Sequence, residues 1–228
     1  EDSVEDVFGY LMASNGPQAD ANKVRAYSEG GAEHLDWLMS LGVPFKASEL
    51  KERAMMALTD DCLLYTGSEK AWPYSEHYKP APRGHNLEVE GDNGGPLLTK
   101  ILLQQVEQRG IDIHYETRAL RLIVSCFGPQ QRIVGLAVRQ NMQEHYFRAS
   151  KGVVLCAGGF IMNEDMVREY CPQFLDNKTQ IGNPNDTGSG IQMGLSVGGR
   201  AINMHEGFLS LPFYPPATLT FGIFVNGQ

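Results

Sequence analysis

The stretch KGVVLCAGGF at residues 151–160 decides the fold class. Its apolar run leads directly into Gly158 and Gly159. Such a run predicts a short strand buried on both faces of a parallel sheet, with a ligand at its carboxyl end. The glycines would let backbone N–H groups approach a phosphate or an aromatic ring, because no Cβ stands in the way. A tight turn that requires positive φ explains the two glycines equally well.

A second glycine-rich loop, DTGSG at residues 186–190, precedes a predicted helix that ends at two further glycines. Unpaired N–H groups at the start of a helix attract anions and polar ligand groups. The alternative is an ordinary helix start, capped by the side chain of Asp186, Thr187 or Ser189. Neither loop is a dinucleotide fingerprint, since no GxGxxG sequence follows a strand in these residues.

Helical and strand patterns alternate along the rest of the sequence. Apolar residues recur at helical spacing in the stretches 3–16, 19–41 and 95–110. Strands of a small antiparallel sheet are predicted in the stretches 111–125, 133–140 and 145–149. This mixture predicts an α/β fold.

The composition excludes some classes of function. The 228 residues carry 19 Lys and Arg against 27 Asp and Glu, which gives a formal charge of −8. This acidic balance argues against a nucleic-acid partner, because a phosphate backbone requires a basic surface. The longest strongly apolar stretch, residues 153–157, is far too short to cross a bilayer, so we expect no membrane span.

The cysteines and histidines argue against disulfides and metal sites. Four scattered cysteines without a CxxC pair are typical of reduced thiols in a cytoplasmic protein, and the acidic start shows no secretory signal. The six histidines adopt no metal-binding spacing, so we expect no metal. Arg83 and His85, in the loop PAPRGH, place a cation beside an imidazole. This pair could bind an acidic group, or the loop could simply be solvated.

The order of these motifs resembles the flavoprotein family of fumarate reductases and succinate dehydrogenases. Within that family the chain is most similar to 3-ketosteroid dehydrogenases of the 3-oxosteroid 4-dehydrogenase type. The resemblance covers nearly all of the sequence. It rests on the succession WLMSLGVPF (37–45), PAPRGH (80–85), GGPLLTKILLQQVEQRGIDIHYETRALRLI (94–123), IVGLAVRQ (133–140), KGVVLCAGGFIMNEDMVREY (151–170), DTGSGIQMGLSVGG (186–199) and FGIFVNGQ (221–228).

This resemblance implies a Rossmann-like FAD-binding domain with a three-stranded antiparallel meander and a helical insertion over residues 1–201. Residues 202–228 would begin an α+β substrate-capping domain. The family's first βαβ unit, with its GxGxxG turn, has no counterpart in the sequence. We therefore expect the 228 residues to be an internal piece of a larger flavoenzyme, inactive alone.

The same resemblance implies FAD as the cofactor and assigns residues to its site. The backbone around Ala119, after a strand at 111–115, would meet the adenine. Two glycine-rich loops would lie near the cofactor, namely Ala157, Gly158 and Gly159 in the first and Gly188, Ser189 and Gly190 in the second. In much of the family the second loop reads Gly-Asp-Gly, so the contact here keeps a hydroxyl and loses a charge. We expect the two loops to lie close together.

The activity implied by the resemblance is FAD-dependent dehydrogenation or reduction of a C–C bond next to a carbonyl. The stretch 210–213, SLPF, stands where fumarate reductases carry a His-Pro pair, and it suits a small hydrophobic carbonyl substrate such as a steroid. Tyr214 is a candidate for the pocket wall, or an aromatic side chain packed on prolines. The catalytic residues are expected beyond residue 228, and the electron acceptor is unassigned.

Three alternative functions remain open. One is a fumarate reductase-like reductase of an unsaturated acid. Another is a flavin-binding or electron-transfer protein without a substrate of its own. The third is a binding module that has lost FAD, which the missing GxGxxG sequence and Ser189 would favour.

Overall fold

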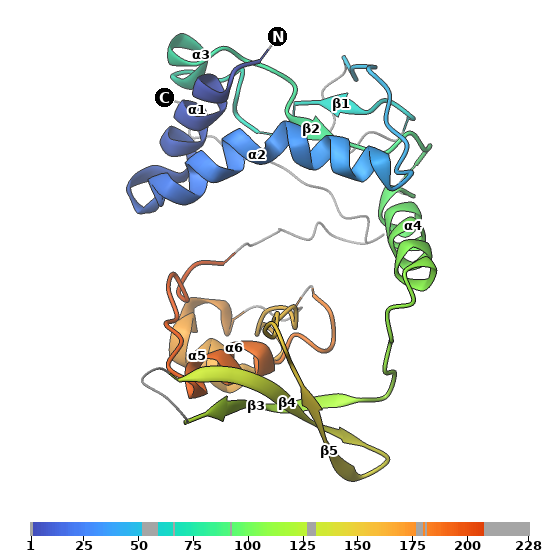
Figure 1. Cartoon of the computed structure of the whole chain (residues 1–228). Coiled ribbons are helices and arrows are strands. Elements are labelled where there is room, and N and C mark those ends of the chain that lie inside the picture. Colours follow the sequence, from blue (N-terminus) through green and yellow to red (C-terminus); the bar gives the residue numbers. More distant parts are fainter. Residues whose placement is uncertain are drawn as a thin grey trace. The chain divides into compact units, whose positions relative to one another are not determined.

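The chain forms two compact units, residues 1–112 and residues 113–228 (Figure 1). The computed structural model describes residues 2–51, 59–65, 67–91, 93–126, 131–176, 180 and 182–207. The candidate domain boundary at residue 201 lies within the second unit and stays a prediction.

Two helices open the first unit, and both begin at a side-chain cap. Helix α1 spans Val4–Asn15, and the Ser3 side chain accepts a hydrogen bond from the Asp6 backbone N–H at 3.0 Å. Helix α2 spans Ala21–Ser40, and Asp20 accepts from the N–H groups of the first turn. Such caps satisfy donors that have no partner inside the helix. The sequence prediction for both helices is confirmed, with ends shifted by one or two residues.

The rest of the first unit consists of short elements. A 3-10 turn at Gly16–Gln18 follows α1, and α3 spans Tyr74–His77. The two-residue strands β1 (Leu63–Leu64) and β2 (Gly84–His85) pair antiparallel. Helix α4 spans Gly94–Gln108, close to the predicted stretch.

A cluster of interacting side chains surrounds Arg83 in this unit. Its guanidinium donates to both carboxylate oxygens of Asp2, at 2.7 and 2.8 Å, and lies 5.3 Å from the centre of the Tyr10 ring. The Asp2 carboxylate also raises the pKa of Arg83. Because Arg83 is only 14% exposed and has this partner, it fastens the start of the chain to the PAPRGH loop. It is not a free cation for an acidic ligand.

The second unit is built on the three-stranded antiparallel meander that the resemblance implied. Its strands are β3 (Arg118–Ser125), β4 (Arg132–Gln140) and β5 (Gln143–Arg148), in the order β3-β4-β5. The central strand β4 contributes the buried residues Ala137 and Val138, whereas β5 is exposed along its length. The meander is thus buried at its central strand β4 and exposed to solvent at its edge strand β5.

Two helices and a 3-10 turn complete the second unit. Helix α5 spans Glu164–Tyr170, a 3-10 turn follows at Pro172–Phe174, and α6 spans Ser189–Ser196. Figure 1 shows α5 and α6 over one face of the meander, where α6 contacts β3. The buried core of these helices consists of Met166, Val167, Cys171 and Met193.

Two predicted strands are wrong. Residues 111–115 and 153–157 have no strand pairing to any described residue, and β3 begins only at Arg118. Val154 is 86% exposed, and Tyr115 is 73% exposed. A strand requires a hydrogen-bonded neighbour, and no such neighbour lies beside either stretch in the described part of the chain. The apolar run at 153–157 is therefore open backbone and not the buried parallel strand that its composition predicted.

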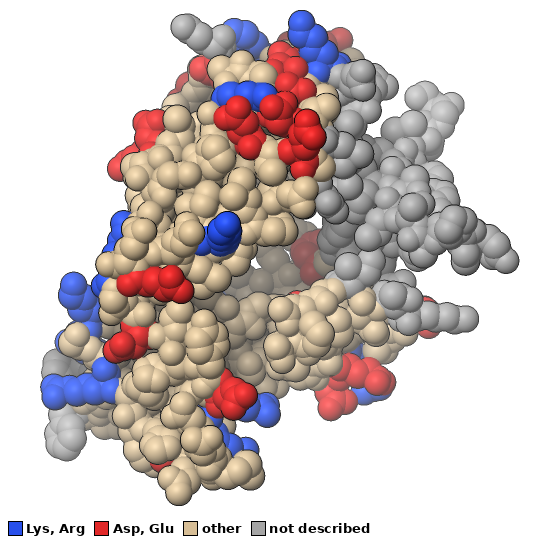
Figure 2. Space-filling model, turned by 90° about the vertical axis from the view of Figure 1, so that its right-hand side faces the viewer, with Lys and Arg blue, Asp and Glu red and all other residues tan. Residues whose placement is uncertain are grey.

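The surface carries both signs of charge. On the face seen in Figure 2, Lys and Arg side chains lie among Asp and Glu side chains. Exposed ion pairs such as Arg121 with Glu144 contribute to this mixture. Within the described residues, no helix combines the length and apolarity that crossing a bilayer requires.

Candidate functional site

The two glycine-rich loops meet in the second unit, as the sequence predicted. The Gly188 N–H donates to the Gly159 carbonyl at 2.8 Å, and the Met162 N–H donates to the Asp186 carbonyl at 2.9 Å. Asn163 adds a side-chain link, because its Nδ2 donates to the Thr187 carbonyl at 2.9 Å. These three hydrogen bonds join the loops into one body.

Glycine is required at this junction because the protein's own atoms fill the space beside the backbone. Gly158 has φ +70°, and a Cβ there would lie 2.1 Å from Oδ1 of Asp186. A Cβ on Gly190 would lie 2.8 Å from that of Ala157, and one on Gly188, at φ +74°, would meet Met166. Packing of the two loops against each other and against α5 therefore requires small residues at these three positions.

Gly159 differs from its neighbours. A Cβ built on it meets no atom within 4 Å, and the residue is exposed. Both glycines are exposed, but only the side-chain direction of Gly159 is open, whereas that of Gly158 is occupied by Asp186. Gly159 is thus the glycine of this group whose missing side chain leaves room for a ligand.

Helix α6 starts at the junction without a side-chain cap. Gly188 occupies the N-cap position in the left-handed conformation, and none of the side chains of Asp186, Thr187 or Ser189 caps the helix. The alternative of an ordinary polar cap is excluded, because the N-cap position is occupied by Gly188, which has no side chain. Within the described part of the chain, no side chain accepts from the first N–H groups of α6, so they are available to an acceptor.

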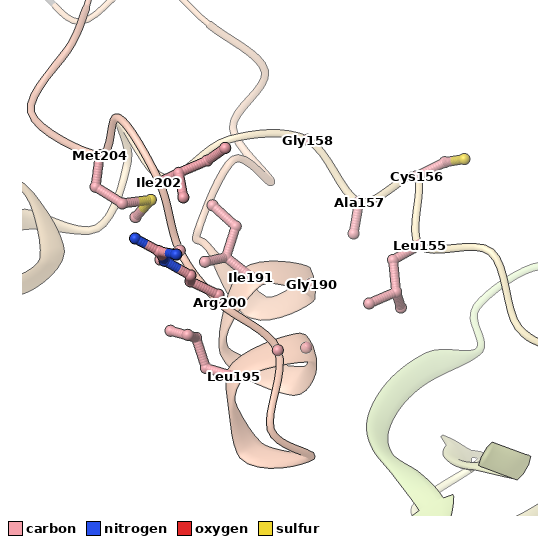
Figure 3. Close-up of a pocket in the computed structure, with 13 residues that line it drawn as sticks. Leu155, Cys156, Ala157, Gly158, Gly190, Ile191, Leu195, Arg200, Ile202 and Met204 are labelled. Carbon is pink, nitrogen blue, oxygen red and sulfur yellow. The ribbon is translucent and has the colours of Figure 1, made fainter. Parts of the chain in front are cut away.

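A pocket of about 430 Å³ lies beside the junction (Figure 3). Its volume is within the range of small-molecule sites. It is lined by residues of the first loop, of α6 and of the segment after α6, namely Leu155, Cys156, Ala157, Gly158, Gly190, Ile191, Gly194, Leu195, Gly199, Arg200, Ala201, Ile202 and Met204. Most of this lining is apolar.

Arg200 is the charged residue of the lining, and the sequence analysis missed it. In Figure 3 the Arg200 guanidinium lies on the side of the pocket where Met204 is drawn, whereas the Cys156 side chain points away from the pocket. Within the described residues, Arg200 forms no ion pair. No sequence motif marks it, because its approach to the first loop depends on how the chain returns along α6.

The segment that carries Arg200 is held by a buried thiol and by an exposed amide. Cys171 Sγ donates to the Met204 carbonyl at 3.1 Å, and Gln173 Nε2 donates to the His205 carbonyl at 3.0 Å. Burial raises the pKa of the Cys171 thiol, so the thiol stays protonated and can donate. These two bonds fix the far wall of the pocket.

The predicted site residues fall into three groups. Ala157, Gly158, Gly159, Gly188, Ser189 and Gly190 are brought together at the junction. Ala119 lies in β3 opposite Val138, at a register shift, and does not line the pocket. Tyr214 lies outside the described residues. Among the described residues, no group of His, Cys, Asp and Glu side chains is arranged to hold a metal ion.

Glycine-rich loops joined at a helix start, beside a pocket, are features that recur in domains that bind nucleotide cofactors. The sequence matches the FAD-binding domain family over residues 1–226, and the chain belongs to that family. The residues present fit FAD, because Gly159 leaves open space and α6 offers free N–H donors at the same junction.

Known proteins similar to this chain are oxidoreductases. The solved structure of 3-ketosteroid-Δ4-(5α)-dehydrogenase from Rhodococcus jostii RHA1 is 35% identical, with a TM-score of 0.79, over 87% of this chain and 41% of that one. The probable fumarate reductase Ifc3 of Shewanella frigidimarina is 27% identical over 87% of this chain and 29% of its own length. The 3-oxosteroid 1-dehydrogenase of Comamonas testosteroni is 22% identical over 81% of this chain and 40% of its own length. The chain thus spans less than half of each relative.

Proposed function

We propose that the whole protein is an FAD-dependent oxidoreductase that dehydrogenates or reduces a C–C bond next to a carbonyl, with a 3-ketosteroid-like substrate. The observation that carries this proposal is the likeness to the Rhodococcus steroid dehydrogenase, whose structure holds 4-androstene-3,17-dione. That relative combines 35% identity with a TM-score of 0.79, a closer likeness than the 27% identity to the fumarate reductase Ifc3.

The described residues would contribute binding and orientation. Bound FAD supplies a two-electron acceptor for hydride. The Gly159 backbone and the N–H groups in the first turn of α6 would hold its polar parts, since a Cβ on Gly159 meets no atom and no side chain caps α6. The apolar lining, including Leu155, Ile191 and Leu195, would exclude water from the pocket. Arg200 would place a positive charge at its edge.

Substrate chemistry separates the proposal from its main alternative. The test is to purify the whole protein, confirm flavin by its visible absorbance, and add a saturated 3-ketosteroid without oxygen. Bleaching of the oxidised flavin is expected, because the substrate transfers two electrons to it. If the ketosteroid leaves the flavin unchanged while fumarate reoxidises the chemically reduced flavin, the protein is a fumarate reductase-like enzyme. A purified protein free of flavin would contradict both.

The location in the cell and the electron acceptor are separate questions. All four cysteines lie in the described part and none forms a disulfide, which supports the proposed cytoplasmic location.

A further inference from the structure

The carboxylate of Asp186 lies at the junction of the two loops. Its Oδ2 accepts a hydrogen bond from the Asn183 N–H at 3.0 Å. Its Oδ1 lies against Gly158, where a Cβ would come within 2.1 Å of it. Gly182 leaves room on the other side, since a Cβ there would lie 3.2 Å from Oδ2. The carboxylate thus occupies space that two glycines leave free.

This placement leaves one oxygen of a half-buried carboxylate without a donor. Within the described residues, no cation forms an ion pair with Asp186, and no hydrogen bond reaches its Oδ1. Partly buried charges are normally compensated by donors, because removal from water weakens their solvation. The Oδ1 position is therefore suited to a donor from outside the described chain.

The charge also restricts which part of a cofactor can lie there. A pyrophosphate group offers only acceptor oxygens and carries negative charge, so a carboxylate repels it. A hydroxyl group can donate to the carboxylate in a charge-assisted hydrogen bond. FAD carries hydroxyl groups on its ribityl chain and on the ribose of its adenosine half.

We propose that Asp186 is a cofactor-binding residue whose Oδ1 accepts a hydrogen bond from a hydroxyl group of bound FAD. The inference rests on the proposed function, because it requires a flavin site at the loop junction. It assigns two tasks to one side chain: Oδ2 holds the loop through Asn183, and Oδ1 receives the ligand. Neither glycine-rich motif singles out this residue for binding.

Ligand selectivity tests the proposal and separates it from a purely structural role. Binding of FAD, riboflavin, ADP and lumiflavin to the apoprotein is measured for the wild type, Asp186→Ala and Asp186→Asn. Riboflavin retains only the ribityl hydroxyls, ADP only the ribose hydroxyls, and lumiflavin has neither. Asp165→Ala is the matched control, because its side chain is 94% exposed and the same charge is removed.

The expected result for Asp186→Ala is a loss of FAD affinity of about tenfold to a hundredfold, the range for a hydrogen bond to a charged group. Either riboflavin or ADP should weaken in parallel, and this identifies which hydroxyl is bound. Lumiflavin affinity should not change, Asp186→Asn should lose less, and the control should behave as the wild type.

Two results would overturn the inference. Equal weakening of riboflavin, ADP and lumiflavin would show that Asp186 only shapes the loops, and unchanged affinities for all ligands would show that it has no part in binding. If the wild-type protein binds no flavin at all, the proposed function itself fails, a result that is seen before any variant is compared.

Discussion

Replacing Gly158 by alanine tests whether the loop junction is packed as the structure shows. The new Cβ would stand at φ +70°, which costs an L residue about 1–2 kcal/mol. It would also lie 2.1 Å from Oδ1 of Asp186, so that side chain must move. Moving it breaks the hydrogen bond from the Asn183 N–H, worth about 1.5–3 kcal/mol for a charged acceptor. We expect Gly158→Ala to lower the free energy of unfolding by about 2.5–5 kcal/mol.

A double-mutant cycle separates the two contributions. In an Asp186→Ala background the obstructing carboxylate is absent, so Gly158→Ala should cost only the backbone strain of about 1–2 kcal/mol. Additive costs, within about 0.5 kcal/mol, would refute the proposed contact between the two residues. Gly159→Ala is the control, because its Cβ meets nothing within 4 Å. It should leave the stability nearly unchanged and weaken FAD binding.

The choice of probe matters for this measurement. Trp37 and Trp72 are the two tryptophans of the chain, and both belong to the first unit. Their fluorescence would report on the unit that does not contain the junction. Denaturant unfolding should therefore be followed by circular dichroism, and amide hydrogen exchange of residues 186–193 should locate the change.

Further predictions concern the caps and the acid stability. Asp20→Ala should destabilise α2 by about 0.5–2 kcal/mol, measured as a lower unfolding midpoint by tryptophan fluorescence, since Asp20 caps two N–H groups. Asn163→Ser keeps a capping oxygen but loses the amide that donates to the second loop. It should lower the free energy of unfolding, followed by circular dichroism, by about 0.5–1.5 kcal/mol. Asn163→Ala loses both groups and should lower it further. The Ser3 hydroxyl, followed by the Lys79 N–H, holds the pKa of Asp6 below its ordinary value of 3.8. This stabilisation is present at neutral pH and is lost as the pH falls below 3.8, so Asp6→Asn should flatten the acid dependence of unfolding.

Local signals in the sequence were sufficient for the helices and the meander. The capping serine before α1 and the alternation in β4 specify structure through residues a few positions apart. The stretches 111–115 and 153–157 were predicted wrongly for the opposite reason. Their apolar character agrees with strands, but strand formation depends on a neighbour that the local sequence does not encode.

The candidate site was predicted in part. The glycines in the sequence predicted both loops. The predicted proximity of the two loops is confirmed by the hydrogen bond from the Gly188 N–H to the Gly159 carbonyl. The structure adds a packing reason for one of the glycines, since the side chain of Asp186 fills the space beside Gly158. Their role toward a ligand stays a prediction. Arg200 could not be predicted, because only the return of the chain along α6 brings it to the pocket.

The unpaired segment 153–157 is expected to make self-association of this chain depend on protein concentration. Within the described residues its backbone makes no hydrogen bond to another segment, and Val154 and Leu155 present apolar side chains to water. An unpaired apolar edge of this kind is a template on which a further strand can add. At low protein concentration the segment is hydrated. At high protein concentration it is expected to pair with an extended segment of another molecule. Light scattering across a dilution series should therefore precede any thermodynamic measurement.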